Sequence, residues 1–279
     1  MYDKLVLSGG GKRGLMLLGS LEYIYQYQKD KVSNIKTYIG SSIGSIICYL
    51  LILDYEPRHI ISFLISNDFF KQFKDVNFVS LTTCSGAYDW NILKKYLFIL
   101  TNDKYKHENI TLKQLYDTFH KELICTTFNF SKQTTEYLSY KTHPDLLCVD
   151  ALRMSSNIPL YFDKFEIDGD YYIDGGITNN FPINILDEHD HALALNCSKM
   201  NLKLDKILIT NYILNLVSSV IISNVKQNIN NCICKNIDII HFDSCTTSTS
   251  DLYVNINDIF SIFSYGFHHS QQFFNNLKT

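Results

Sequence analysis

The chain has 279 residues, of which 46% are hydrophobic and 19% are charged. This length supports one large domain, or one domain with a modest appendage, and the composition excludes an intrinsically disordered chain. The formal net charge is −3 and the basic residues are scattered, so we expect no nucleic-acid partner.

The eight cysteines and the start of the chain bear on the cellular compartment. The opening MYDKLVLSGGGKRG lacks the continuous apolar stretch of a secretory signal, so we expect reduced cysteines and a cytoplasmic protein. Cys232 and Cys234 form a C-x-C, which is not a zinc spacing, so no metal is expected. Many Asn, Ile, Lys and Tyr residues have A/T-rich codons, which indicates a source such as a large virus or a protist.

The first part of the chain predicts a parallel sheet. An apolar strand is expected over residues 4–8 and a helix over 15–27, with glycines between them. The same order of strand, turn and helix repeats between residues 37 and 53. Two such units in succession predict a parallel sheet with helices on its faces.

The middle of the chain predicts a mixture of helices and strands. Pro57 suits the first turn of a helix that reaches about Ser66, and Thr111 suits the N-cap of a later helix. The further predicted elements are a helix over 91–100, a hairpin of 123–130 with 135–140, a short helix over 149–156, a strand pair over 166–173 that turns at Asp168 and Gly169, and a strand over 192–196.

Residues 207–225 contain no charged side chain, which raises the question of a membrane span. Polar residues nevertheless recur there at helical spacing and form one stripe: Asn211, Asn215, Ser218, Ser219 and Ser223. Such a stripe indicates an amphipathic helix. We expect it to pack on the rest of the protein, ahead of contact with a membrane, and a span is the least favoured alternative.

The first chemical motif is Gly40-Ser41-Ser42-Ile43-Gly44, a G-x-S-x-G. It lies between a predicted strand and an apolar helix, where a nucleophilic serine would occupy a strained turn. Glycines are needed on both sides because a side chain would clash with the neighbouring backbone. The alternative is an ordinary glycine-bounded start of a helix.

The second motif is GGGKRG at residues 9–14, which also satisfies G-x-G-x-x-G. A dinucleotide-binding loop would need an acid about twenty residues later at a strand end, whereas Asp30 lies in the polar segment QKDK. A phosphate-binding Walker loop is excluded because no Ser or Thr follows Lys12 at the required spacing. Consecutive glycines at a helix N-terminus can instead present N–H groups to an oxyanion.

The third motif is Tyr171-Tyr172-Ile173-Asp174-Gly175-Gly176, followed by Asn-Asn-Phe-Pro at residues 179–182. An Asp-Gly pair is usually only a turn. Asp174, however, follows three apolar residues and precedes more glycine than a hairpin needs. We therefore expect its carboxylate to point into a cleft at the end of a core strand.

At these residues the sequence resembles the patatin-like phospholipase family. The family's motifs occur in the same order, with GGGKRG after the first strand, then GSSIG, and later DGG. Ser155, Ser156 and Pro159 resemble its serine-to-proline block, and Asn-Asn-Phe-Pro resembles its Asn-x-Pro ending. The resemblance covers roughly residues 4–190, and no motif of the family follows.

The resemblance implies a three-layer α/β/α sandwich with a mainly parallel central sheet, and a Ser-Asp dyad without a catalytic histidine. Ser42 would attack the ester carbonyl, and Asp174 would accept its proton and then activate water against the acyl-enzyme. Arg13 would steady the glycine loop or bind a lipid phosphate. The amides of Gly9, Gly10 and Gly11 would form the oxyanion hole, with Gly10 and Gly11 foremost. Further motif support would come from Gly14, Gly40, Gly44, Gly175 and Gly176.

On this basis we expect a catalytic domain over residues 1–190 and a mostly helical C-terminal extension over 191–279 packed on it. The expected substrate is a phospholipid or another acyl-ester lipid, with peripheral membrane contact. The aromatic segment Phe69 to Phe78, which also holds Lys71 and Lys74, could form an interfacial patch or fill the core. No cofactor is expected. Because no EF-hand loop is present, chelators should leave activity unchanged.

Two alternatives remain open. A Ser-His-Asp hydrolase would place several strands before its nucleophile, whereas one strand precedes Ser42, so the histidines at positions 189, 191, 241, 268 and 269 are expected to be structural or exposed. A catalytically silent lipid-binding protein is the alternative from another class, and the completeness of the three motifs argues against it. The same dyad would also serve a general esterase or a triacylglycerol lipase.

Overall fold

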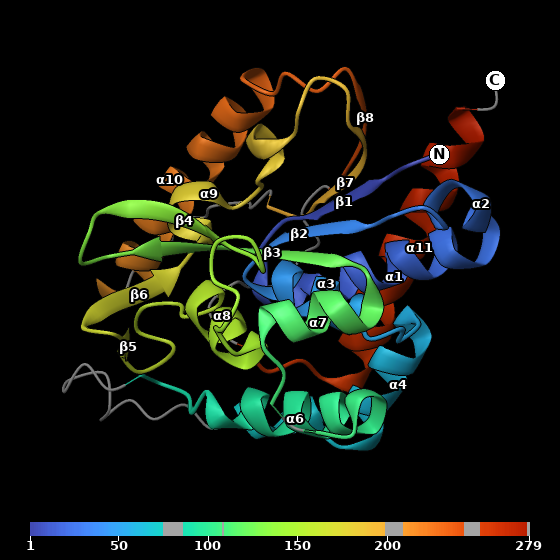
Figure 1. The fold of residues 1–279 in the computed structure, drawn as a ribbon. Coiled ribbons are helices and arrows are strands. Elements are labelled where there is room, and N and C mark those ends of the chain that lie inside the picture. The colour runs from blue at the N-terminus through green and yellow to red at the C-terminus, as the bar shows by residue number, and fades with distance from the viewer. Residues whose placement is uncertain (75–85, 108, 199–208, 243–251, 278–279) are drawn as a thin grey trace.

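The computed structural model describes residues 1–74, 86–107, 109–198, 209–242 and 252–277. Its described residues form an eight-stranded sheet with the order β5-β6-β3-β2-β1-β7-β8, and β4 pairs with β3 (Figure 1). The strands are β1 (Lys4–Leu7), β2 (Thr37–Ser41), β3 (Glu122–Asn129), β4 (Thr134–Leu138), β5 (Phe165–Ile167), β6 (Asp170–Asp174), β7 (His191–Asn196) and β8 (Asn236–His241).

The centre of the sheet is parallel and one side of it is antiparallel. β1 pairs in parallel with β2 and β7, β2 with β3, and β7 with β8. The antiparallel pairs are β3 with β4, β3 with β6, and β5 with β6. The parallel core predicted from two strand-turn-helix units is therefore confirmed.

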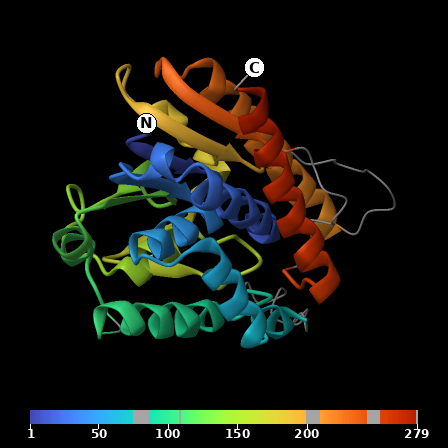
Figure 2. The ribbon, with the colours of Figure 1, turned by 90° about the vertical axis from the view of Figure 1, so that its right-hand side faces the viewer.

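Helices cover both faces of the sheet, as expected for a three-layer α/β/α sandwich (Figures 1 and 2). α1, α3 and α11 lie on one face, and α9 and α10 lie on the other. The helices are α1 (Gly14–Tyr27), α2 (Lys29–Val32), α3 (Ile43–Ile52), α4 (Pro57–Ser66), α6 (Asn91–Tyr105), α7 (Leu112–Phe119), α8 (Cys148–Ser155), α9 (Gly176–Asn179), α10 (Ile209–Asn230) and α11 (Ile256–Asn276), with short 3₁₀ turns η1 (Gly11–Arg13), η2 (Phe69–Phe73) and η3 (Ile183–Ile185).

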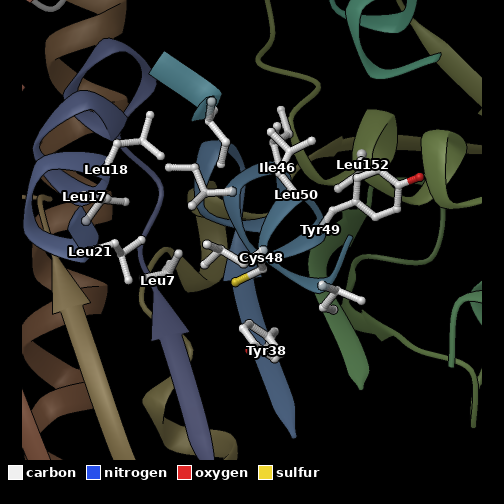
Figure 3. Packing of buried hydrophobic residues seen from close by; sticks show 14 of the residues in the cluster. Leu7, Leu17, Leu18, Leu21, Tyr38, Ile46, Cys48, Tyr49, Leu50 and Leu152 are labelled. Atoms are coloured by element: carbon white, nitrogen blue, oxygen red, sulfur yellow. The ribbon is translucent and has the colours of Figure 1, made fainter. Parts of the chain in front are cut away.

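The alternation of side chains along β1 explains the two cores. Leu5 and Leu7 point into the larger cluster, whereas Val6 points into the smaller cluster on the opposite face. Figure 3 shows Leu17 and Leu21 of α1 close to Leu7 of β1. A strand that is apolar on both faces is typical of a parallel sheet buried between helix layers.

Several local predictions are confirmed. α4 has the predicted bounds, and the predicted hairpin is formed by β3 and β4. Thr111 caps α7, because its hydroxyl accepts the Gln114 amide at 3.1 Å while the Gln114 side chain accepts the Thr111 amide at 2.9 Å. The strand pair β5 and β6 turns at Asp168 and Gly169, both of which have positive φ.

The C-terminal region contributes to the sheet as well as to the helix layers. β7 pairs with β1 along its length, and β8 pairs with β7. The expected boundary at residue 190 therefore lies between strands of one sheet. Residues beyond it complete the sheet and supply α10 and α11.

One side of α10 packs on the protein, as expected. Val225 is buried, the Asn224 side-chain amide donates to the Ile177 carbonyl at 3.2 Å, and the Asn228 side-chain amide donates to the Asn179 side chain at 2.7 Å. About half of each side chain is exposed in an outer apolar row formed by Tyr212, Leu216 and Val220. Within the described residues, no helix is long and apolar enough to cross a membrane.

α1 and α11 approach each other closely through two glycines, which gives a prediction about stability. A Cβ on Gly19 would lie 1.9 Å from the Phe263 carbonyl oxygen, and one on Gly266 would lie 2.0 Å from the Met16 carbonyl oxygen. We expect Gly19→Ala to lower the free energy of unfolding in urea by about 1–3 kcal/mol, since the helices must separate. Ser264→Ala, at an exposed position of α11, should cause no loss; equal stability of both variants would contradict this account of the packing.

Candidate active site

Ser42 occupies a strained turn between β2 and α3. Its φ of 54° and ψ of −125° are unusual for a residue with a side chain. A Cβ on Gly40 would lie 2.3 Å from the Ser45 nitrogen, and one on Gly44 would lie 2.4 Å from the Leu7 carbonyl oxygen. Both flanking glycines are therefore required by the packing, as the motif predicts.

Asp174, the last residue of β6, lies at the same end of the sheet as Ser42. β3 separates β2 from β6, with Thr126 opposite Ser41 and Thr127 opposite Asp174. The Ser42 hydroxyl donates to Asp174 Oδ2 at 2.5 Å, although the two residues are 132 positions apart. The sheet thus brings the first and third motifs into direct contact.

The surroundings of Asp174 change its acidity. Burial raises the pKa of this carboxyl from 3.8 to about 6, and hydrogen bonds from Ser42 and from the Gly176 amide partly offset that rise. The Gly176 amide donates to Oδ1 at 2.6 Å. A carboxylate of raised pKa remains ionised at neutral pH and is a stronger base than an exposed aspartate.

Gly175 and Gly176 let the chain turn away directly after Asp174. A Cβ on Gly175 would lie 2.1 Å from the Thr126 carbonyl oxygen, and one on Gly176 would lie 2.5 Å from Asn180 Oδ1. The double glycine therefore permits close backbone approach at the point where α9 begins.

The glycine loop lies against the same site, but its first amide is already used. Gly9 N–H donates to the Asn180 carbonyl oxygen at 3.0 Å, and the Asn180 side-chain amide donates to the Gly9 carbonyl at 3.2 Å. This corrects the expectation that Gly9 donates to an oxyanion, because one N–H makes one strong bond. Gly10 and Gly11 remain as candidate donors, and Gly11 has a φ of +55° that favours glycine.

Arg13 and Gly14 hold this loop in place. Arg13 is buried, and its Nε donates to the Gly10 carbonyl oxygen at 3.2 Å. A Cβ on Gly14 would lie 2.5 Å from Ile43, so the glycine allows α1 to begin close to α3. Arg13 was expected to steady the glycine loop or to bind a lipid phosphate, and these contacts favour the first role. The neighbouring residue Lys12, by contrast, lines the pocket beside Ser42.

An apolar pocket of about 90 Å³ opens beside Ser42. Phe70 and Phe73 of η2 are buried and line it, so this part of the aromatic segment fills the interior. Lys71 and Lys74 are exposed, and Phe78 lies outside the described residues. The other described lining residues are Gly11, Lys12, Ile43, Ile46, Phe69, Leu93, Ser156, Ile158, Phe162 and Leu252.

The C-terminal histidines are bonded elsewhere. His241 Nδ1 lies 3.2 Å from the Asn196 side chain, His268 Nδ1 lies 3.4 Å from Gln271, and His269 Nε2 lies 2.9 Å from the carbonyl oxygen of His241. His191 is the first residue of β7, at the end of the sheet opposite to Ser42. In the part of the chain that is described, the ionisable side chain that accepts the Ser42 hydroxyl is thus the carboxylate of Asp174.

Comparison with known proteins decides the family. A family model described as patatin-like phospholipase matches residues 5–187. The chain belongs to the patatin-like phospholipase family. The region that the resemblance covered is therefore confirmed almost to its limits.

This patatin-like chain has viral relatives. It is 36% identical over 186 residues to "Probable lipid hydrolase 463L" of Invertebrate iridescent virus 6, and 33% identical over 186 residues to "Uncharacterized protein R571" of Acanthamoeba polyphaga mimivirus. Each alignment covers 66% of this chain, and 63% and 61% of the respective relative. The chain thus spans less than two thirds of these relatives, and a viral relative agrees with one of the sources that the composition indicated.

Solved structures share the patatin-like fold. VipD from Legionella pneumophila matches with a TM-score of 0.55 at 17% identity, covering 99% of this chain and 67% of VipD. The type III effector protein ExoU matches with a TM-score of 0.51 at 16% identity, covering 97% of this chain and 53% of ExoU. At these identities the comparison establishes the fold only, a mixed, mostly parallel sheet with helices on both sides.

Proposed function

We propose that the protein is a lipid acyl hydrolase of the phospholipase A type, which cleaves carboxylic ester bonds of phospholipids through Ser42 and Asp174. The observation that carries the proposal is the 2.5 Å hydrogen bond from the Ser42 hydroxyl to a buried carboxylate. The Ser42 turn, the glycine loop and the apolar pocket surround this pair. The name of the viral relative, a probable lipid hydrolase, supports the same chemistry.

The proposed reaction begins with the Ser42 hydroxyl proton, which is directed at Asp174 Oδ2. As Ser42 Oγ attacks the ester carbonyl, its proton moves to Asp174 Oδ2, and the amides of Gly10 and Gly11 stabilise the oxyanion. Collapse of this intermediate breaks the ester bond, and Asp174 returns the proton to the departing alcohol oxygen of the lysophospholipid. Asp174 then removes a proton from water, which attacks the acyl-enzyme. The bond between the acyl group and Ser42 Oγ breaks, Asp174 returns the proton to Ser42 Oγ, and the fatty acid is released.

The pocket indicates how a phospholipid would bind. Its apolar wall suits the part of an acyl chain next to the ester, since its volume is well below the roughly 300–1,000 Å³ of sites that enclose whole ligands. Lys12 is the charged side chain among the described lining residues, so it is placed to bind the phosphate of the substrate.

Neutralising Lys12 tests this assignment. We expect Lys12→Met to raise KM for a monomeric short-chain phosphatidylcholine by about 3- to 10-fold, in keeping with a partly exposed ion pair. A neutral diacylglycerol with the same short chains should keep its kinetic constants, because it has no phosphate. Equal losses on both substrates, measured below their micelle concentrations, would contradict a phosphate contact.

The pH profile tests the carboxylate as base. Because Asp174 must be ionised to accept the proton, kcat/KM should rise with pH up to about 6 and be level above it. A histidine base would give a similar profile, so the residual activity of Asp174→Asn is measured as well. If the rise persists in that variant, another group is the base.

Product analysis tests the function as a whole. The wild type should convert a phospholipid with two different acyl chains into one free fatty acid and the matching lysophospholipid, both detected by mass spectrometry. Turnover of triacylglycerol with phospholipid untouched would support the triacylglycerol lipase alternative. Binding of vesicles without any product would support the silent lipid-binding alternative.

A further inference from the structure

The hydrogen bonds around Ser42 form a closed ring through two other serines. The Ser42 amide donates to Ser155 Oγ at 3.0 Å. Ser45 Oγ lies 2.6 Å from the Ser42 carbonyl oxygen and 3.1 Å from Ser155 Oγ. The Ser45 hydroxyl is the donor to the Ser42 carbonyl oxygen, and the Ser155 hydroxyl oxygen accepts the Ser42 amide. The ring therefore holds both the N–H and the C=O of Ser42.

The C-terminal end of α8 and the residues that follow it also bind the backbone of Asp174 and Gly175. The Ser155 carbonyl oxygen accepts the Gly175 amide at 3.2 Å, and the Asn157 carbonyl oxygen accepts the Asp174 amide at 2.9 Å. Residues 155–157 thus bind the backbone on both sides of the hydrogen bond between Ser42 and Asp174. Their position determines how these two side chains meet.

The backbone of Ser42 is strained, and the ring of hydrogen bonds holds it in this conformation. A residue with a side chain keeps a φ of 54° only where its surroundings impose it, at a cost of about 1–3 kcal/mol. Ser155 is completely buried, so its hydroxyl does not contact substrate. Its effect on the reaction must pass through the backbone of Ser42.

We propose that Ser155 is a positioning residue, which holds the Ser42 turn and the Asp174 turn in the geometry for proton transfer. The proposal rests on the proposed function of Ser42 and Asp174. Without the Ser155 hydroxyl, the Ser42 backbone loses its fixed orientation and its side chain no longer points steadily at the carboxylate. The loss therefore falls on kcat rather than on KM.

A matched control separates positioning from stability. The Thr127 hydroxyl donates to the Met154 carbonyl oxygen at 2.8 Å in the same turn of α8, and Thr127 is equally buried. Ser155→Ala and Thr127→Val each remove a buried hydroxyl that has two hydrogen-bond contacts, so we expect similar decreases in Tm. We expect kcat to fall by about 100-fold in Ser155→Ala, with KM little changed, because small displacements of reacting groups are costly. Thr127→Val should keep kcat near the wild-type value.

Variants of Ser45 provide a second test of the positioning role. Ser45→Ala should lower kcat in the same direction, and Ser45→Ala combined with Ser155→Ala should add little, because both open one ring. Ser45→Ala alone tests the ring if Ser155→Ala folds poorly. Wild-type kcat in a folded Ser155→Ala variant, or additive losses in the double variant, would overturn the positioning role. Absence of turnover in the wild type would instead overturn the proposed function.

Discussion

Ser42→Ala should reduce ester hydrolysis by about 10⁴-fold or more, because the proposed acyl-enzyme forms on the Ser42 hydroxyl. The protein should remain folded, since the substitution removes only an oxygen from a buried side chain. The measurement is kcat/KM on a soluble ester together with the midpoint of urea unfolding. Alanine also tolerates the positive φ at this position no worse than serine does.

The neighbouring serine provides the control. Ser41 belongs to the same motif and is completely buried, and its hydroxyl has no hydrogen-bond partner among the residues that the structure describes. Ser41→Ala should therefore keep full activity and equal or slightly higher stability, because it removes an unpaired polar group. Similar loss of activity in both variants would show that the motif matters only for folding.

Asp174→Asn should reduce turnover by about 10²- to 10⁴-fold and at the same time stabilise the protein at neutral pH. Burial raises the pKa of Asp174 from 3.8 to about 6, so holding the charged form in the folded protein costs about 3 kcal/mol. Asparagine removes that cost and still accepts the Gly176 amide. The lost activity and the gained stability have the same cause, a buried charge needed for proton transfer.

The sign of the effect on stability depends on pH. A pKa that is higher in the folded state than in the unfolded state favours folding below about pH 4, and this contribution is lost as the pH rises through about 6. The variant should thus exceed the wild type in urea unfolding at about pH 8, and the difference should shrink towards about pH 4. Lower stability of Asp174→Asn at about pH 8 would contradict the assigned pKa.

Local features of the fold were predictable because neighbouring residues determine them. The Ser42 turn follows from Gly40 and Gly44, where any side chain would meet backbone atoms within 2.4 Å. The cap at Thr111 and the turn at Gly169 depend on short-range hydrogen bonds and on φ. Ser42 and Asp174 could be named because their motifs occur in the order found in a known family.

Other features depend on contacts between distant residues that leave no local pattern. Gly9 cannot serve an oxyanion because Asn180, 171 positions away, takes its amide, and nothing in the glycine run reveals this. The sequence identified Ser155 as part of a family motif. Its proposed role, however, depends on contact between the end of α8 and the Ser42 turn. β8 adds to the sheet through pairing with β7, which the sequence of residues 236–241 alone does not specify.

Covalent labelling with an alkyl fluorophosphonate, followed by peptide mass spectrometry, tests the central claim most directly. The tryptic peptide of residues 37–58 contains Ser41, Ser42 and Ser45, and fragment ions distinguish them. We predict one phosphonyl adduct on Ser42, formed at a much lower rate in Asp174→Asn. An adduct on another residue, or labelling of Ser42 at the same rate without the Asp174 carboxylate, would contradict a Ser42–Asp174 dyad.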